Sequence, residues 1–184
     1  MRRFPRLVHL LALALTLAGC ASGPEATRVE FQGDYHRSRD GTLGYRLPAG
    51  WFDVTADSQA TGRAIWLVRN DYGASITVEE VYLMARAEGE LGEEPLLHLA
   101  QLTLPLVAGA RSAGVVRQPE LFRLNGREYC AYELVSREGS EHLRVVLFKA
   151  RHRVYAVTFY GDGTEAAART LRALEEPFLR TLRW

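Results

Sequence analysis

The chain has 184 residues, of which 47% are hydrophobic and 24% are charged, values typical of one globular domain rather than of a disordered or fibrous protein. Its 23 basic and 22 acidic residues nearly balance, and without residues 1–19 it keeps 20 basic against 22 acidic side chains. Nucleic-acid binding normally needs a basic stripe that neutralises phosphates, so this composition disfavours it.

The first 19 residues have the parts of a secretory signal. Three arginines precede the mostly apolar run Leu7–Gly19, which is shorter than the roughly 20 residues that a membrane-spanning helix needs. The run leads into Leu17-Ala18-Gly19-Cys20, which resembles a bacterial lipobox at all four positions. Ordinary signal cleavage nearby, which would release a soluble periplasmic protein, is the disfavoured alternative.

The lipobox resemblance implies that Cys20 becomes the lipid-attachment residue. It would carry a diacylglyceryl thioether, with a further acyl chain such as palmitate on its new amino terminus, and two or more chains anchor a protein stably. In Gram-negative lipoproteins an aspartate just after the cysteine tends to retain the protein in the inner membrane. Ala21 stands there, so we expect the periplasmic face of the outer membrane. Cys130 is then left without an intramolecular partner.

Three parts are predicted along the chain. Residues 1–19 are the signal peptide, and residues 20–40 are the lipidated cysteine and a flexible tether, because Ala21–Thr27 is small, polar and aperiodic. Residues 41–184 form the folded domain. Arg28–Tyr35 is a candidate first strand, so the compact part is expected to begin between residues 28 and 42.

The first half of the domain is predicted to be mainly strands. Gly44–Leu47 alternates apolar and polar residues before a proline. Ala64–Arg69 and Ala74–Met84 are rich in β-branched and aromatic residues, and Asn70–Gly73 between them has the composition of a hairpin turn. One face of the Ala74–Met84 strand is wetter than the other, because its alternate positions differ in polarity.

A helix is predicted after a polar loop at Glu88–Glu94. Pro95 suits a first helical turn, and apolar or small residues then recur on one face: Leu96, Leu99, Ala100 and Thr103. Pro105 is expected to kink or stop this helix and to leave Leu106–Ala110 as a distorted last turn.

Strands return from Val115 to Tyr160. Asn125-Gly126 is a strong two-residue hairpin signal. The predicted strands are Glu120–Leu124, Arg127–Ser136, His142–Ala150 and Val154–Tyr160. Their short connections require antiparallel pairing. The last strand is apolar on both faces, as expected for a strand covered on both sides of a sheet.

The chain ends in a second predicted helix. Thr164 is a good N-cap, and Leu171, Leu174 and Phe178 form one apolar stripe. Pro177 is expected to interrupt the helix before Phe178–Trp184.

The stretch Tyr45-Arg46-Leu47-Pro48-Ala49-Gly50-Trp51 resembles the opening of PsbP-like and DcrB-like proteins, several of which are bacterial lipoproteins. The order of strand pair, apolar helix, Asn-Gly meander and terminal helix is also similar, over about residues 41–184. The resemblance implies an α+β fold, an antiparallel sheet flanked by helices in an α/β/α sandwich. It also implies a non-enzymatic role in assembly or interaction, and it transfers no cofactor, metal or partner residue.

No catalytic, cofactor or metal constellation is predicted. Gly161–Ala166 superficially fits a dinucleotide fingerprint, but the chain ends at Trp184 without room for the required parallel strand. No serine lies in G-x-S-x-G. Glu79 and Glu80 point to opposite faces of a strand and cannot act as a pair. The histidines share no ligand spacing: His36, His98, His142 and His152.

Three smaller features have a structural and a functional interpretation. Cys130 is a buried small hydrophobe in the favoured view and a reactive thiol in the other. Arg151-His152-Arg153 is a solvated hairpin turn or a contact for anionic head groups. Trp51 and Phe52 are core aromatics or an exposed binding edge. In each case the structural interpretation is favoured.

The sequence thus predicts a lipid-anchored, non-enzymatic domain in the cell envelope that binds a protein partner or takes part in envelope assembly. The membrane is reached through the acyl chains on Cys20, and no nucleic acid is expected as a partner. The alternative is a carrier of a small hydrophobic ligand or lipid in a pocket between sheet and helix, suggested by the apolar Leu96–Val107 segment.

Overall fold

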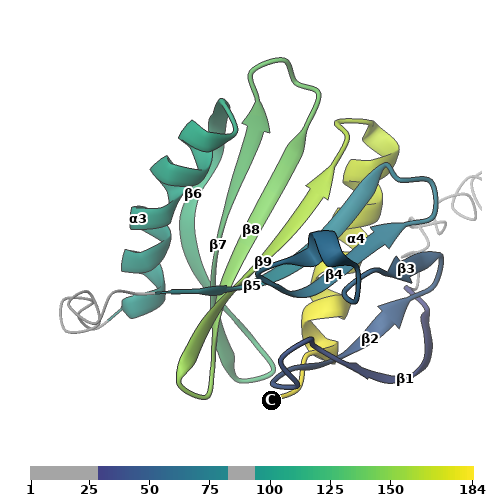
Figure 1. The fold of residues 1–184 in the computed structure, drawn as a ribbon. Helices are drawn as coiled ribbons and strands as arrows, with labels where there is room; N and C mark the ends of the chain where they lie inside the picture. Colours follow the sequence, from purple (N-terminus) through teal and green to yellow (C-terminus); the bar gives the residue numbers. More distant parts are fainter. Residues whose placement is uncertain (1–28, 83–93) are drawn as a thin grey trace, which may run out of the picture.

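A computed structural model describes residues 29–82 and 94–184. Residues 1–28 and 83–93, which include the lipobox, the first nine residues of the predicted tether and nearly all of the loop predicted at Glu88–Glu94, lie outside the described residues. The described part folds into two antiparallel sheets and two α-helices (Figure 1).

The larger sheet has seven strands in the order β3-β4-β5-β9-β8-β7-β6, and β1 pairs with β2 in a separate two-stranded sheet. The elements are β1 (Phe31–Arg37), β2 (Gly44–Pro48), β3 (Trp51–Asp53), the 3-10 turn η1 (Ser58–Ala60), β4 (Arg63–Arg69), β5 (Ala74–Val81), α3 (Pro95–Ala110), β6 (Ala113–Leu124), β7 (Arg127–Ser136), β8 (His142–Ala150), β9 (Arg153–Gly161) and α4 (Glu165–Thr181). β1 lies inside the range 20–40 assigned above to the tether, so the folded part includes it.

Two apolar clusters pack on opposite faces of the large sheet. On one face Leu171, Leu174 and Phe178 of α4 pack on β4, β5 and β9. On the other face Leu96 and Leu99 of α3 pack on residues of β7 and β8. The two helices therefore flank the sheet in Figure 1, and the predicted α+β sandwich is confirmed.

Local hairpin signals were reliable predictors. β6 and β7 pair antiparallel across Asn125-Gly126, where both residues have positive φ (52° and 75°), as a type I′ turn requires. β4 pairs with β5 across the predicted turn Asn70–Gly73. The Thr164 hydroxyl accepts from Ala167 N at 3.2 Å, which confirms the predicted N-cap.

Neither proline ends its helix, so the interruption predicted at Pro177 is wrong, and of the two outcomes predicted for Pro105 the stop is excluded. α3 continues through Pro105 to Ala110, and α4 continues through Pro177 to Thr181. A proline leaves the carbonyl four residues earlier without its helical partner. Gln101 and Ala173, to which those carbonyls belong, are exposed residues, so water can satisfy the carbonyls and each helix continues past its proline.

The double covering predicted for Val154–Tyr160 is only half correct. Tyr155, Val157 and Phe159 of β9 are buried under α4. The alternate residues Ala156, Thr158 and Tyr160 are half-buried. The reason is the position of α3, which lies over β6, β7 and β8; within residues 29–82 and 94–184, no other helix covers the rest of that sheet face.

Candidate functional site

On one face of the seven-stranded sheet, the strands covered by α3 end at β8, and the uncovered strands begin at β9. One row of paired residues crosses the sheet from β7 to β4: Tyr132, Val145, Thr158, Thr77 and Trp66. The first two are buried at 0% and 3% exposure, whereas the last three are half-buried. A parallel row shows the same change between Leu143 and Tyr160.

The uncovered half of the sheet and the side of α3 enclose a trough of about 380 Å³. Its lining consists of Arg63, Trp66, Ser75, Thr77, Glu79, Val107, Ala110, Arg111, Leu143, Thr158 and Tyr160. Hydroxyl groups and two aromatic rings thus form most of its floor. A surface of this kind can offer hydrogen bonds and apolar contact to a macromolecule at the same time.

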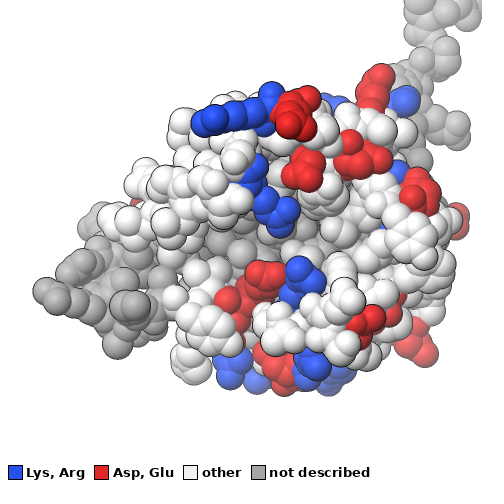
Figure 2. All heavy atoms as spheres, turned by 45° about the horizontal axis from the view of Figure 1, so that its top comes forward, with Lys and Arg blue, Asp and Glu red and all other residues white. Residues whose placement is uncertain are grey.

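Three charged residues line the trough, Arg63, Glu79 and Arg111, and the first two are paired. The Arg63 guanidinium lies 4.4 Å from the centre of the Trp66 ring and 3.3 Å from Glu79 Oε1, so it caps one face of the indole. Tyr160 donates its hydroxyl to Glu141 at 3.3 Å. Figure 2 shows basic and acidic side chains intermixed around a hollowed surface, without a large region of one sign.

The helix beside the trough has an unusual outer surface. α3 contains no Asp, Glu, Lys or Arg, whereas α4 carries six such residues on and around its exposed side. Leu102 and Leu106 of α3 are 48% and 72% exposed. They are spaced by four residues from each other and from Ala110, so all three form one stripe. Of the three, Ala110 lines the trough, so the stripe runs along the side of the helix that borders it.

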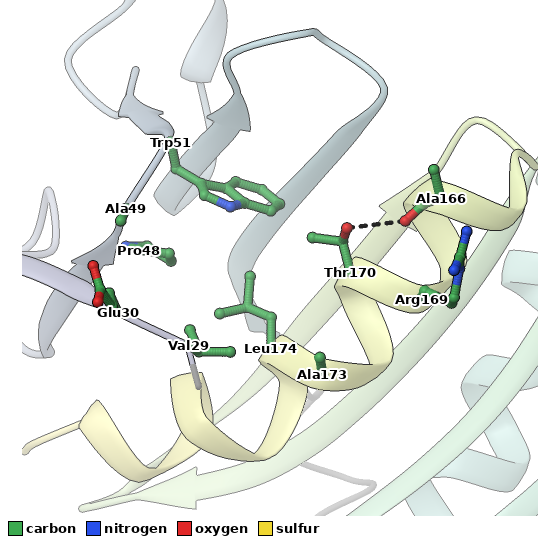
Figure 3. A pocket seen from close by; sticks show the side chains of 10 residues that line it. All are labelled: Val29, Glu30, Pro48, Ala49, Trp51, Ala166, Arg169, Thr170, Ala173 and Leu174. Carbon is green, nitrogen blue, oxygen red and sulfur yellow. Dashed lines mark hydrogen bonds between the residues drawn. The ribbon is translucent and has the colours of Figure 1, made fainter. Parts of the chain in front are cut away.

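A second, larger cleft of about 580 Å³ lies between α4 and the segments that contain β1, β2 and β3. Figure 3 shows Trp51 and Leu174 pointing into it, with Val29 beside them. Ala173 is one of the small α4 residues that leave this space open, and Arg169 lies at the rim with a largely exposed side chain. The apolar Leu96–Val107 segment does not form this cleft, because its buried leucines are packed on β7 and β8.

The aromatic and cysteine predictions can be compared with the structure directly. Trp51 is 4% exposed and belongs to the core, whereas its neighbour Phe52 is 53% exposed. Cys130 is buried and unpaired, and burial raises the pKa of its thiol to about 11. A thiol in this state is a poor nucleophile near neutral pH, so the small-hydrophobe interpretation is favoured.

The remaining polar candidates are dispersed. Glu79 pairs with Arg63, and Glu80 pairs with Arg153 at 2.8 Å, which places the two glutamates in different ion pairs. Arg151 and His152 are exposed at the hairpin tip. Within residues 29–82 and 94–184, no three His, Cys, Asp or Glu side chains converge as a metal site. Over the same ranges, no helix is long and apolar enough to span a membrane.

One partly exposed polar cluster joins the two sheets. Asp53 of β3 accepts hydrogen bonds from Tyr45 of β2 and from Thr55 N at 3.0 Å, and His36 Nδ1 of β1 lies 3.3 Å from its carboxylate. Burial acts to raise the pKa of Asp53, but the hydrogen bonds from Tyr45 and Thr55 outweigh it and hold the pKa below its ordinary value. Burial and the Asp53 contact raise the pKa of Tyr45.

Sequence reasoning missed the residues of the trough. It noted the wetter face of the strand that contains Thr77 and Glu79, but it did not connect this face with Trp66, Thr158 or Tyr160. A usable signal was present in the uncharged composition of Pro95–Ala110. A surface helix normally has charged residues on its outer face, and their absence marks a contact surface.

No protein-family profile and no curated protein matches the chain. Among solved structures it is similar to cyanobacterial PsbP (CyanoP) from Synechocystis sp. PCC 6803, with a TM-score of 0.59, 12% identity and coverage of 89% of this chain and 98% of that one. It is also similar to the Ran-binding protein Mog1p of Saccharomyces cerevisiae, with a TM-score of 0.58, 10% identity and coverage of 84% and 96%. At these identities the likeness shows the fold alone, which is the PsbP-like α+β fold.

Proposed function

We propose that this chain is a lipid-anchored, non-enzymatic protein-interaction module of the bacterial cell envelope. The observation that carries the interaction role is the trough beside α3, where no helix of the described residues covers that half of the sheet face and the adjacent helix has exposed leucines. Its hydroxyls and ion-paired charges suit surface recognition rather than proton transfer. The resemblance of Leu17–Cys20 to a lipobox supports the anchor, and Ala21 supports an outer-membrane location.

The anchor is tested with the two cysteines of the chain. The full chain is expressed in a Gram-negative host with an alkyne-bearing palmitate, and Cys20→Ala is compared with Cys130→Ala. We expect label on the wild type and on Cys130→Ala and none on Cys20→Ala. Equal labelling of the two variants, or an unlabelled wild type, would contradict lipid attachment at Cys20.

The interaction surface is tested in the same host by site-specific photocrosslinking. A photoreactive residue at Thr77 lies on the trough floor, and one at Thr170 lies on α4 in the other cleft. We expect crosslinked protein species from position 77 and few or none from position 170. Absence of crosslinks at 77, or the same bands from both positions, would contradict the role of the trough.

The α4 cleft supports a second candidate function, the binding of a small hydrophobic ligand. A volume of about 580 Å³ falls within the roughly 300–1,000 Å³ range of ligand pockets. We expect a fluorescent fatty acid to bind the wild type and Ala110→Phe, which changes the trough. Ala173→Phe, which fills the cleft, is expected to lose binding. Equal binding by both variants would exclude the cleft as the binding site.

A further inference from the structure

We propose that the trough is occupied by α3 of a second copy of this chain, so that two anchored copies form a face-to-face dimer. This inference rests on the proposed interaction role and names its partner. The starting point is the width of the sheet face that no helix of the described residues covers beside α3. β9, β5, β4 and β3 span roughly 15 Å at the usual strand spacing, and a helix with its side chains is roughly 10–12 Å wide. One further helix therefore fits beside α3.

The occupant must be a helix without charges on the surface that becomes buried. α3 itself meets this requirement, because it has no charged side chain and its leucines at 102 and 106 are exposed. The outer side of α4 does not, because Arg169, Arg172 and Glu176 are exposed there. Burying those charges without partners would be costly.

The arrangement is self-complementary. The two-fold axis runs between the two copies of α3. Each helix then packs on β7 and β8 of its own chain with one side. Its opposite side packs on β9, β5, β4 and β3 of the other copy. The contact is therefore isologous and closes after two copies. Leu102, Leu106 and Ala110 then lie opposite the same residues of the second helix. Arg111 follows the last residue of α3 and lines the trough; it is exposed in the single chain, and the proposal places it at the rim of the contact.

The extent of the surface also favours a second copy. Eleven residues line the trough, and the outer side of α3 adds His98, Gln101, Leu102, Pro105, Leu106 and Gly109. This set approaches the roughly 20 residues a side of a stable protein interface. Two copies held in one membrane also meet at high effective concentration, which compensates for a modest interface.

The test is disulfide crosslinking of the full chain in its membranes. Leu106→Cys lies near the proposed axis, and Arg172→Cys on α4 is the matched exposed control. We expect mild oxidation to give a species of twice the chain mass from Leu106→Cys and not from Arg172→Cys or from the wild type, in which Cys130 is buried. Adding Thr77→Arg to Leu106→Cys is expected to lower the dimer yield about tenfold or more. Thr170→Arg, the matched control, should leave it unchanged.

The outcomes distinguish a failure of the dimer from a failure of the proposed interaction role or of the lipid anchor. A chain that resists crosslinking at 106, or that is equally crosslinked at 172, overturns the dimer. If position 106 instead crosslinks to a different polypeptide, the second copy is excluded while the interaction role stands. Failure of lipid labelling at Cys20 contradicts the anchor only, because Cys20→Ala combined with Leu106→Cys still reports on the α3 contact.

Discussion

The cluster around Asp53 is expected to make a measurable contribution to stability, and Asp53→Asn tests it. The carboxylate links three strands, since it contacts His36 on β1 and Tyr45 on β2 from its own position on β3. The substitution keeps the size of the side chain but removes the charge. It also replaces one acceptor oxygen by a donor, which faces Tyr45 or Thr55 N.

The expected cost follows from the contacts. Hydrogen bonds to charged groups contribute about 1.5–3 kcal/mol. The Asp53 side chain is 23% exposed, so screening by solvent reduces this contribution. We therefore expect the free energy of unfolding to fall by about 1.5–2 kcal/mol near neutral pH. Asp34→Asn, an exposed position on β1, serves as the control and should change it by less than about 0.5 kcal/mol.

The pH dependence gives a second, independent check. The pKa of Asp53 in the folded chain is lower than its ordinary value of 3.8, so its charge stabilises the fold above that value. This contribution is lost as the pH falls through the folded-state pKa. The difference between wild type and Asp53→Asn should therefore persist down to about pH 5 and shrink below about pH 4.

Urea unfolding followed by tryptophan fluorescence at several pH values measures both quantities. The wild type, Asp53→Asn and Asp34→Asn are compared under identical conditions. If Asp53→Asn costs no more than Asp34→Asn at pH 7, the carboxylate does not hold the sheets together as argued. If the cost is the same at pH 3 as at pH 7, it does not come from the charge.

Three further outcomes are expected. Gly163→Ala should destabilise the fold by about 1 kcal/mol or more, because Gly163 has a φ of +79° and the added Cβ would lie 2.6 Å from the backbone of Ser140. The control Gly139→Ala has a similar φ of +69° but open space around the added Cβ. It should lower the free energy of unfolding by less in the same urea assay. Cys130 should resist a maleimide at pH 8 in the native chain and react in urea, because burial raises its pKa to about 11; rapid native labelling would contradict its burial. Phe178→Ala should lower the free energy of unfolding by about 3–5 kcal/mol, since Phe178 is fully buried against Phe159; a cost below 1 kcal/mol would show that α4 is not tightly packed.

Sequence patterns predicted the local part of the fold well. The hairpin at Asn125-Gly126, the N-cap at Thr164 and the buried stripe of α4 each depend on residues within one or two turns of each other. Short-range geometry determines such features, so the composition and spacing of nearby residues are enough to predict them. The PsbP-like opening at residues 45–51 added the architecture, which the structure confirms.

Features that depend on long-range placement were missed. Pro105 and Pro177 do not end their helices, because Gln101 and Ala173, which lose a helical partner, are exposed residues, and exposure depends on the tertiary fold. The trough was missed for a related reason. Whether Thr158 is covered depends on which strands α3 lies over, and no periodicity within β9 or α3 encodes that position.

The strand order also has a consequence for how the chain folds. β6, β7, β8 and β9 are joined by short turns and lie side by side in sequence order, whereas β5 reaches its partner β9 only through pairs such as Val81 and Val154. Closing that long loop costs more entropy than closing a hairpin, so non-local pairing is slow. We expect the β6–β9 meander to acquire amide protection first during refolding. The β5–β9 ladder should then form late and couple the two halves of the sheet.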